Sequence, residues 1–316
     1  MSIRIASFNA YKFSTNTHKD VSIVAQIIKD YEIDIIAIQE IFSKDAMIKL
    51  KNELGTQWNG YWESPTPYYG SVQSAEGYSF LWNTSRFHLS KNRTGKEFTP
   101  RIFSQYAHKD FGKLVRDPLY GRFTLNSNEM IEIRLLNTHI VYSMDKQIND
   151  SDERDITNER IGDITMRKRE LEILTSRLLP KIDNKDYDAQ YGERDGMCRR
   201  PYTILLGDYN LNLKESGAKG AFIDNPIIEI IDADSKKVIT TIQTDLSTLK
   251  SKTQDNPNIT GYSNNFDHFT YDSERSIKTA AYALKIPSER KYGLDYDAYK
   301  KDVSDHLMIV LDLELI

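Results

Sequence analysis

The sequence predicts an α+β fold with more strands than a doubly wound sheet needs. Short runs of β-branched and aliphatic residues recur along the chain and are typical of buried strands. Between some of these runs, apolar residues recur at helical spacing. The composition is that of a globular protein, because 39% of the 316 residues are hydrophobic and 28% are charged. We therefore expect a mixed fold with a sizeable core.

Four predicted strands end directly before polar residues that do not suit a core. They are Ile3–Phe8 before Asn9, Ile33–Ile38 before Gln39 and Glu40, Ile131–Leu136 before Asn137, Thr138 and His139, and Thr203–Leu206 before Gly207 and Asp208. A further strand is predicted at Leu307–Leu315, and the Tyr- and Phe-rich stretch 61–123 is interpreted as strands and loops. The spacing and the short connections favour mostly antiparallel pairing.

Three amphipathic segments are predicted as helices. They are residues 21–31 with Asp20 as N-cap, residues 46–54 ended by Gly55, and residues 161–178 closed by Pro180. Two polar stretches, Ser143–Asn158 and Asp183–Arg200, are predicted as solvated loops. We find no linker and no internal repeat, and we therefore expect one domain over residues 1–316 with these two insertions.

The bulk properties exclude several classes of protein. The only cysteine, Cys198, excludes an intramolecular disulfide, which suits a reducing compartment. The N-terminus lacks a secretory signal pattern, and no apolar run approaches the roughly 20 residues that span a bilayer. We therefore expect a cytoplasmic chain that does not enter a membrane. With 46 acidic and 42 basic side chains the net charge is −4, so any phosphate-bearing substrate must be held by a local site.

Polar residues at the predicted strand ends form a candidate site. They are Asn9, Glu40, His139, Asp208, Asn210, Asp305 and His306. Taken singly, each of them has an ordinary structural explanation, such as a turn, a cap or a core histidine. Gathered on one edge, carboxylates and amides would bind a hard divalent cation such as Mg²⁺, and the two histidines could move protons near neutral pH.

The order of these motifs resembles the endonuclease/exonuclease/phosphatase superfamily, the fold of deoxyribonuclease I and exonuclease III. The motifs are SFNAY with Asn9, IQEIF with Glu40, NTH with His139, GDYNLN with Asp208 and Asn210, and SDH with Asp305 and His306. They extend over nearly the whole chain. The resemblance implies a four-layer αββα sandwich, in which two packed and mostly antiparallel sheets are flanked by helices.

Two further segments resemble the deoxyribonuclease I branch, and a third resembles a segment of the superfamily as a whole. Glu76 precedes a Tyr-x-Phe-Leu run, Arg116 lies in an Arg-acidic-Pro segment, and Asp267 occupies the place of the aspartate that supports the C-terminal histidine. Two features depart from the pattern. Ser74 stands where a DNA-contacting tyrosine is expected, and the interval between His139 and Asp208 is longer than the family core requires.

The resemblance implies a role for each residue. The expected metal ligands are Glu40, Asn9 and Asp305, and the expected ion is Mg²⁺, with Mn²⁺ or Ca²⁺ as alternatives. The expected substrate-binding groups are Arg116, Asn210 and Asn9. The expected catalytic groups are His139, His306, Asp208, Asn210, Asp267 and Glu76. Within this set Glu76 would pair with His139 and Asp267 with His306. Which histidine acts as acid and which as base stays open.

These roles predict a metal-dependent phosphodiester hydrolase. We expect a monomeric, largely nonspecific DNA endonuclease that acts on duplex DNA and leaves 3′-hydroxyl and 5′-phosphate ends. The segment 103–122 mixes basic and aromatic residues that could hold a nucleic-acid backbone: Phe103, Tyr106, Lys109, Phe111, Lys113, Arg116, Tyr120 and Arg122. Two alternatives stay open: a phosphatase or a phospholipid or inositol phosphodiesterase on the same scaffold, and a catalytically inactive binding module. The sequence points to no protein partner.

Overall fold

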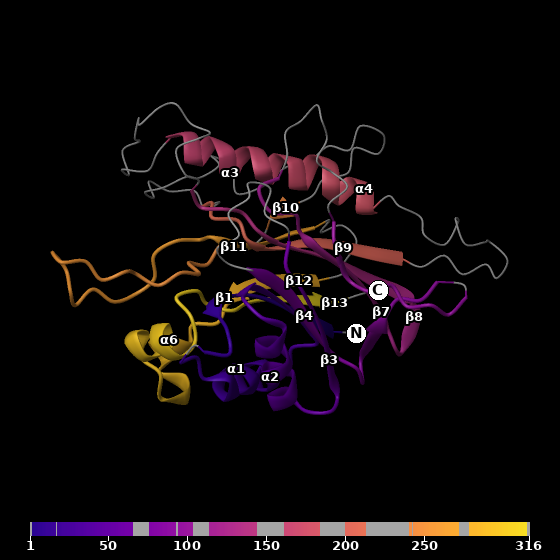
Figure 1. Cartoon of the computed structure of the whole chain (residues 1–316), viewed down its shortest axis with the longest axis horizontal. Helices are drawn as coiled ribbons and strands as arrows, with labels where there is room; N and C mark the ends of the chain where they lie inside the picture. The colour runs from indigo at the N-terminus through magenta and orange to yellow at the C-terminus, as the bar shows by residue number, and fades with distance from the viewer. Residues whose placement is uncertain are drawn as a thin grey trace.

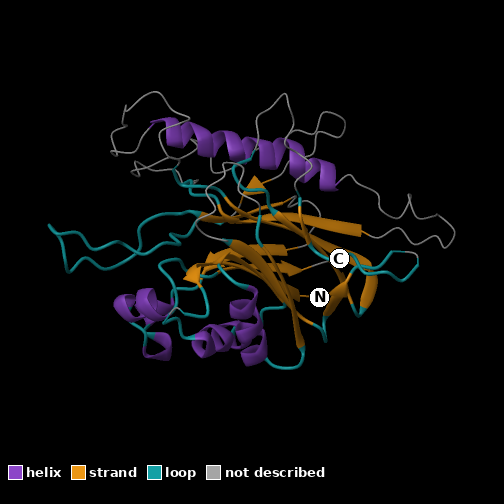
Figure 2. Ribbon diagram, in the orientation of Figure 1, coloured by secondary structure: helices purple, strands orange, loops and turns teal. Residues whose placement is uncertain are grey.

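The computed structural model describes residues 2–16, 18–65, 76–92, 94–103, 114–143, 161–183, 200–212, 240–241, 243–271 and 278–314. Two β-sheets pack face to face, and helices cover the outer face of each (Figures 1 and 2). This arrangement confirms the predicted αββα sandwich. Much of the two predicted loops, together with Ser74 and Cys198, lies outside the described residues.

The first sheet has six strands and is built around the N-terminal strand. In sheet order the strands are β12 (Lys278–Ala283), β13 (Ile309–Glu314), β1 (Ser2–Phe13), β2 (Ile35–Ile41), β4 (Gly77–Asn83) and β3 (Trp58–Glu63). Only the β1–β2 pair is parallel, and the other pairs are antiparallel. The central strand β1 is therefore joined to strands that lie at opposite ends of the sequence.

The second sheet has seven strands. In sheet order they are β10 (Thr240–Thr241), β11 (Asp267–Tyr271), β9 (Arg200–Asp208), β8 (Asn128–His139), β7 (Leu119–Leu125) and β5 (Phe87–Leu89), with β6 (Arg101–Ile102) also paired to β7. The β8–β9 pair is parallel and the other pairs are antiparallel. The prediction of mostly antiparallel sheets is confirmed.

Capping residues determine where the first two helices begin and end. On the first sheet lie α1 (Val21–Asp30), α2 (Lys44–Leu54) and α6 (Tyr296–Asp302), the last of which contacts α5 (Ile286–Glu289) (Figure 1). The Asp20 side chain accepts the backbone N–H groups of Ser22 and Ile23 and caps α1 as predicted. Gly55 ends α2 with a φ of 106°, which favours glycine.

The predicted end of the third helix at Pro180 is wrong. The helix α3 (Ile161–Ile173) continues through a π-helical turn, Leu174–Leu178, into α4 (Leu179–Asp183). A proline inside a helix lacks an N–H and clashes with the carbonyl of the preceding turn. The wider π-turn directly before Pro180 changes the spacing of that turn, so the helix passes the proline.

Apolar side chains fill three layers. The larger cluster occupies two of them: between the sheets, where the rings of Phe80 and Phe123 meet with centroids 5.4 Å apart, and between the first sheet and its helices, where Val24 and Leu50 are buried. The smaller cluster lies between the second sheet and the α3–α4 segment, and it includes side chains from Leu171 to Ile182. No helix in the described part of the chain is long and apolar enough to cross a membrane.

Candidate active site

Polar residues at the ends of strands from both sheets meet at one edge of the sandwich. The parallel β8–β9 pair places His139 opposite Asp208, and the antiparallel β9–β11 pair places Asp208 opposite Asp267. From the other sheet, Asn9 Nδ2 of β1 donates a hydrogen bond to Asp208 Oδ2 at 3.0 Å. Strand register therefore brings together residues that are distant in the sequence.

Two residues at this edge have left-handed backbone conformations. The φ angle is 55° at Glu40 and 50° at Asn210. The pairing of β2 with β4 shifts register between Ile38 and Ile41, an irregularity of the kind that re-aims a side chain. A left-handed conformation is uncommon for glutamate and costs about 1–3 kcal/mol, so the surrounding structure must enforce it. The backbone at this edge is therefore locally strained at Glu40 and Asn210.

Asp208 lies at the centre of the site and is 1% exposed. Its Oδ2 atom is approached by the Nε2 atoms of both histidines, at 3.6 Å from His139 and 3.7 Å from His306. Burial raises the pKa of the Asp208 carboxyl, although the two neighbouring histidines oppose this effect. A raised pKa makes this carboxylate a better proton acceptor.

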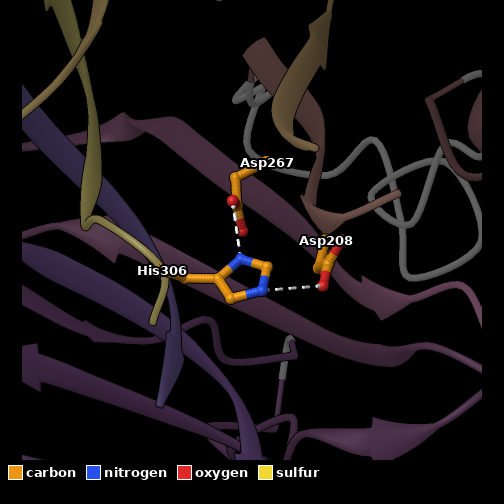
Figure 3. A group of neighbouring side chains, drawn as sticks. All are labelled: Asp208, Asp267 and His306. Atoms are coloured by element: carbon orange, nitrogen blue, oxygen red, sulfur yellow. Dashed lines mark hydrogen bonds and ion pairs between the residues drawn. The ribbon is translucent and has the colours of Figure 1, made fainter. Parts of the chain in front are cut away.

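Figure 3 shows the His306 ring between Asp267 and Asp208. Its Nδ1 atom lies 2.9 Å from Asp267 Oδ2, which also accepts a 2.6 Å hydrogen bond from Ser247 Oγ. Burial lowers the pKa of His306, but the charges of Asp267 and Asp208 outweigh burial and raise it well above its ordinary value. Asp208, Asp267 and His306 also offer ligand atoms that all lie within 4.8 Å of one another. His306 is therefore a cation near neutral pH, with Nε2 directed at Asp208.

His139 has a similar arrangement on the other side of Asp208. Its Nδ1 atom lies 2.6 Å from Glu76 Oε1, and Arg116 Nη1 donates to the same oxygen at 2.6 Å. Arg116 Nη1 and His139 Nδ1 are 2.9 Å apart. The predicted Glu76–His139 pair is thus brought together, and Arg116 joins it.

The ionisation of this group follows from its charges. Burial raises the pKa of Glu76, but His139 and Arg116 outweigh burial and lower it below its usual value. Burial lowers the pKa of His139, yet the carboxylates of Glu76 and Asp208 raise it overall against the opposing charge of Arg116. Arg116 is 23% exposed, and a guanidinium has N–H groups beyond Nη1 that can reach a substrate oxygen.

His268 provides a contrast within the same segment. Its Nε2 atom lies 3.0 Å and 2.7 Å from the carbonyl oxygens of Leu211 and Asn265, so it donates to the backbone. Burial without a carboxylate partner lowers the pKa of His268 to about 4. The positive charge on His306 therefore arises from Asp267 and Asp208, and His268 is a neutral core histidine.

Carboxylate oxygens suited to a divalent cation lie beside the histidines. Glu40 Oε2 accepts the backbone N–H of Lys12 at 3.0 Å, and both Glu40 and Asp305 lie within electrostatic reach of Lys19. Asp305 Oδ1 is buried and accepts no hydrogen bond from the described residues. A buried anionic oxygen without a donor is costly, and a hard cation would satisfy it. Glu40 and Asp305 therefore fit a Mg²⁺-type ion.

The Asn9 amide is oriented differently from the prediction. Its Nδ2 atom donates to Glu40 Oε1 at 3.1 Å as well as to Asp208, and its Oδ1 accepts the backbone N–H of Tyr11 at 3.0 Å. An N–H group cannot ligate a cation. In this arrangement Asn9 orients the two carboxylates, and its amide would have to turn over to bind metal.

Asn210 lies beside Asp208 and is 6% exposed. Its backbone N–H donates to Asp208 Oδ1 at 2.8 Å, and its side-chain Nδ2 donates to the carbonyl oxygen of Ile140 at 2.7 Å. The side chain is thus held against the backbone that follows His139. All ten predicted site residues consequently lie in the described structure, and nine of them are joined by direct contacts around Asp208, Glu40 and Glu76.

Part of the predicted basic and aromatic segment is not a surface. Arg122 is 2% exposed, and its Nη2 atom lies 2.5 Å from Glu132 Oε2. The described aromatic residues of the segment are buried as well: Phe103 and Tyr120. Because these three side chains are buried, they cannot contact DNA. Residues 104–113, including Lys109 and Lys113, lie outside the described residues.

Three supporting residues were missed at the level of sequence. The Ser247 hydroxyl binds Asp267, the Ser304 hydroxyl donates to the backbone oxygen of Asn9 at 2.7 Å, and the Tyr78 hydroxyl accepts the His139 backbone N–H at 3.1 Å. Ser304 and Tyr78 belong to motifs already identified, so adjacency could have indicated them. Ser247 has no sequence signal, because its contact with Asp267 depends on the tertiary fold.

Solved structures of low sequence identity share the fold. An endonuclease/exonuclease/phosphatase family protein from Bacteroides thetaiotaomicron is 15% identical, with a TM-score of 0.57 and coverage of 99% of this chain and 97% of its own. D. rerio TDP2, solved with a single-strand DNA product, is 14% identical, with a TM-score of 0.54 and 99% coverage of both chains. A mannosyl-6-phosphatase from Bacteroides thetaiotaomicron is 13% identical, with a TM-score of 0.53 and coverage of 98% and 99%.

Sequence comparison gives the family directly. A search of curated proteins finds no match. The profile of the Endonuclease/Exonuclease/phosphatase family matches residues 6–225. This range includes seven of the ten predicted site residues: Asn9, Glu40, Glu76, Arg116, His139, Asp208 and Asn210. The chain belongs to the endonuclease/exonuclease/phosphatase family.

Proposed function

We propose that this protein is a divalent-metal-dependent phosphodiester hydrolase that cuts DNA largely without sequence preference and leaves 3′-hydroxyl and 5′-phosphate ends. One observation carries the proposal. Two histidines, each held by its own carboxylate, direct Nε2 at Asp208 Oδ2 from 3.6 and 3.7 Å, beside the carboxylates of Glu40 and Asp305. Such a site combines a proton acceptor, proton donors and cation ligands.

The chemistry of a phosphodiester requires these parts. Its anionic phosphorus needs charge neutralisation, the attacking water must lose a proton, and the leaving oxygen must gain one. A divalent ion on Glu40 and Asp305 would supply Lewis-acid neutralisation of the phosphate. Asp208 would accept the proton of the water, since burial raises its pKa. His139 and His306 would share proton donation and stabilisation of the developing charge, and Arg116 would hold a non-bridging oxygen.

Two exposed aromatic residues favour a nucleic acid as the substrate. Among the described residues, the large apolar side chains that are exposed are Tyr11 at 36% and Tyr142 at 45%. Tyr11 follows Asn9 by two residues and Tyr142 follows His139 by three. Lys19 Nζ lies 5.2 Å from the ring centroid of Tyr11, and Arg167 Cζ lies 4.4 Å from that of Tyr142. At Tyr11 an aromatic ring beside a cation is suited to stack a base while the charge attracts the backbone. Arg167 is 1% exposed, so at Tyr142 it supports the ring from inside the protein.

Plasmid cleavage tests the proposal. Supercoiled plasmid should be nicked with Mg²⁺ and stay intact when chelator is added. His139→Ala and His306→Ala should each lower the rate by about 100-fold or more, because each removes a group that moves a proton. His88→Ala is the matched control, since His88 lies on β5 and contacts Asn126. Intact plasmid at every enzyme concentration, or full activity in both site variants, would overturn the assignment.

A phosphomonoesterase is the second candidate. The fold likeness to a mannosyl-6-phosphatase supports including sugar phosphates in the assay, although the likeness concerns the fold alone. Release of inorganic phosphate from sugar, nucleotide or inositol phosphates would be measured in parallel with nicking. Phosphate release without nicking would select this candidate in place of the nuclease.

A further inference from the structure

Glu170 is a buried carboxylate that the proposed chemistry does not use. It lies on α3 within the interval between His139 and Asp208 and is 4% exposed. Its Oε1 atom accepts the backbone N–H of Val115. A charged side chain is rarely buried to this degree unless it has a specific partner. Here the partner is the backbone N–H of Val115, the residue directly before Arg116.

Val115 and Arg116 lie in the described segment 114–118, which has no strand structure and directly precedes β7 (here called the Arg116 loop). Leu114 packs in the apolar cluster under α3, and the carbonyl oxygen of Pro118 accepts the N–H of Phe103 at 2.9 Å. Between these two anchors, the contact of Glu170 with Val115 is the hydrogen bond nearest to Arg116 on its N-terminal side among those of the described residues. The position of the arginine backbone consequently depends on a side chain of α3.

The position of Arg116 matters because its contacts are short. Its Nη1 atom lies 2.6 Å from Glu76 Oε1 and 2.9 Å from His139 Nδ1. A shift of 1 Å at a positioning contact can cost about 100-fold in rate. The charged groups that act on Glu170 come from the same loop and from β8, namely Arg116, Asp117 and His139. The helix is thus coupled to the Glu76–His139 pair through this loop.

We propose that Glu170 is a positioning residue that fixes the Arg116 loop, so that the guanidinium is held against Glu76 and His139 where it meets a substrate phosphate. The role of Arg116 toward phosphate rests on the proposed function, whereas the anchoring of the loop does not. α3 therefore contributes to the active site from outside it.

Kinetics of variants test the role. Glu170→Ala removes the acceptor and should lower kcat/KM by about 10- to 100-fold, whereas Glu170→Gln keeps an acceptor oxygen and should stay within about threefold of the wild type. Glu172→Ala is the matched control, because Glu172 is exposed on the same helix. The decisive comparison is a double-mutant cycle with Arg116→Ala. If Glu170 acts through Arg116, Glu170→Ala should have little further effect in that background.

Equal losses in both backgrounds, or a Glu170→Gln variant as impaired as Glu170→Ala, would overturn the proposal. A readout without substrate separates it from the proposed function. In the metal-free protein, amide hydrogen exchange at Val115 should be slow in the wild type and in Glu170→Gln and faster in Glu170→Ala. If the wild type cleaves no substrate, the exchange result still decides whether Glu170 anchors the loop, and unchanged exchange in Glu170→Ala would refute it.

Discussion

At the scale of single residues, the carboxylates behind the histidines decide how the site is charged. Asp267 receives hydrogen bonds from Ser247 and His306 and is fully buried. Asp267→Asn keeps the shape but removes the charge that holds His306 protonated and correctly oriented. We expect kcat to fall by about 100-fold or more with KM little changed.

The control for this variant is Asp34→Asn. Asp34 is also buried, but it lies just before β2, where it accepts the backbone N–H of Arg4 and forms an ion pair with Arg86. The Asp34→Asn variant should be less stable than the wild type but should keep the wild-type activity per folded molecule. A similar loss of kcat in both variants, measured under conditions in which both are folded, would contradict the assignment of Asp267.

Glu170 should make the free energy of unfolding depend on pH. Burial raises its pKa from 4.5 to about 7. Between these two values the folded state binds more protons than the unfolded state, so the free energy of unfolding falls as pH rises and is constant above about 7. The loss is about 3 kcal/mol at 1.36 kcal/mol per pKa unit.

Glu170→Gln carries no charge at any pH and should therefore unfold at a higher temperature than the wild type at pH 8, but not at pH 4.5. Thermal unfolding at several pH values measures the difference. Glu172→Gln on the same helix should follow the wild type throughout, because Glu172 is exposed. Parallel wild-type and Glu170→Gln curves would mean that folding does not change the pKa of Glu170 and would contradict this prediction.

At the scale of elements, the contact between β8 and β9 determines the alignment of His139 with Asp208. Gly207 has a φ of 143°, and a Cβ atom there would lie 1.9 Å from the Thr138 carbonyl oxygen. Gly207→Ala must push the two strands apart one residue before the site. We expect a loss of more than about 3 kcal/mol in the free energy of unfolding, together with loss of activity.

Gly261→Ala is the control that distinguishes the cost of a positive φ angle from the cost of a steric clash. Gly261 has a φ of 110°, but an added Cβ would meet nothing within 4 Å. It should cost only the strain of a left-handed alanine, about 1–2 kcal/mol, and leave activity intact. Chemical denaturation of both variants makes the comparison, and equal losses would show that the strand contact is not decisive.

At the scale of the whole molecule, metal binding should stabilise the folded state. An ion that binds only the native site at 100 times its dissociation constant adds about 2.7 kcal/mol. Mg²⁺ should therefore raise the melting temperature of the wild type, and Glu40→Gln should reduce that shift. Glu53→Gln, an exposed change on α2, is the control. An equal Mg²⁺ shift in the wild type and Glu40→Gln would remove Glu40 from the ligand set.

Much of the fold was predictable because the functional residues of this chain directly follow its strands in the sequence. Buried strands appear as short aliphatic runs, and Asn9, Glu40, His139 and Asp208 follow them at one edge of the sandwich. The resemblance then supplied partners such as Asp267, whose contact with His306 depends on the tertiary fold. These features are readable because each is local in the sequence or recurs in a family.

The remaining features depend on contacts that no local pattern encodes. From the sequence, Arg122 is predicted as a surface cation. In the structure it is buried and forms an ion pair with Glu132 on the neighbouring strand. The helix passes Pro180 because a π-turn precedes it. Glu170 has no signal at all, since a buried glutamate and an exposed one look alike on a mixed helix. In each case a distant partner decides the outcome.

The pairing of β1 with both β2 and β13 has a consequence for how the protein reaches its folded state. The Ser304 hydroxyl binds the backbone oxygen of Asn9 across 295 residues of sequence, and His306 follows two positions later. Contacts of such long range form slowly, because a large loop must close before they contribute. The catalytic edge therefore assembles late, and recovery of activity after dilution from denaturant should lag behind recovery of helical signal.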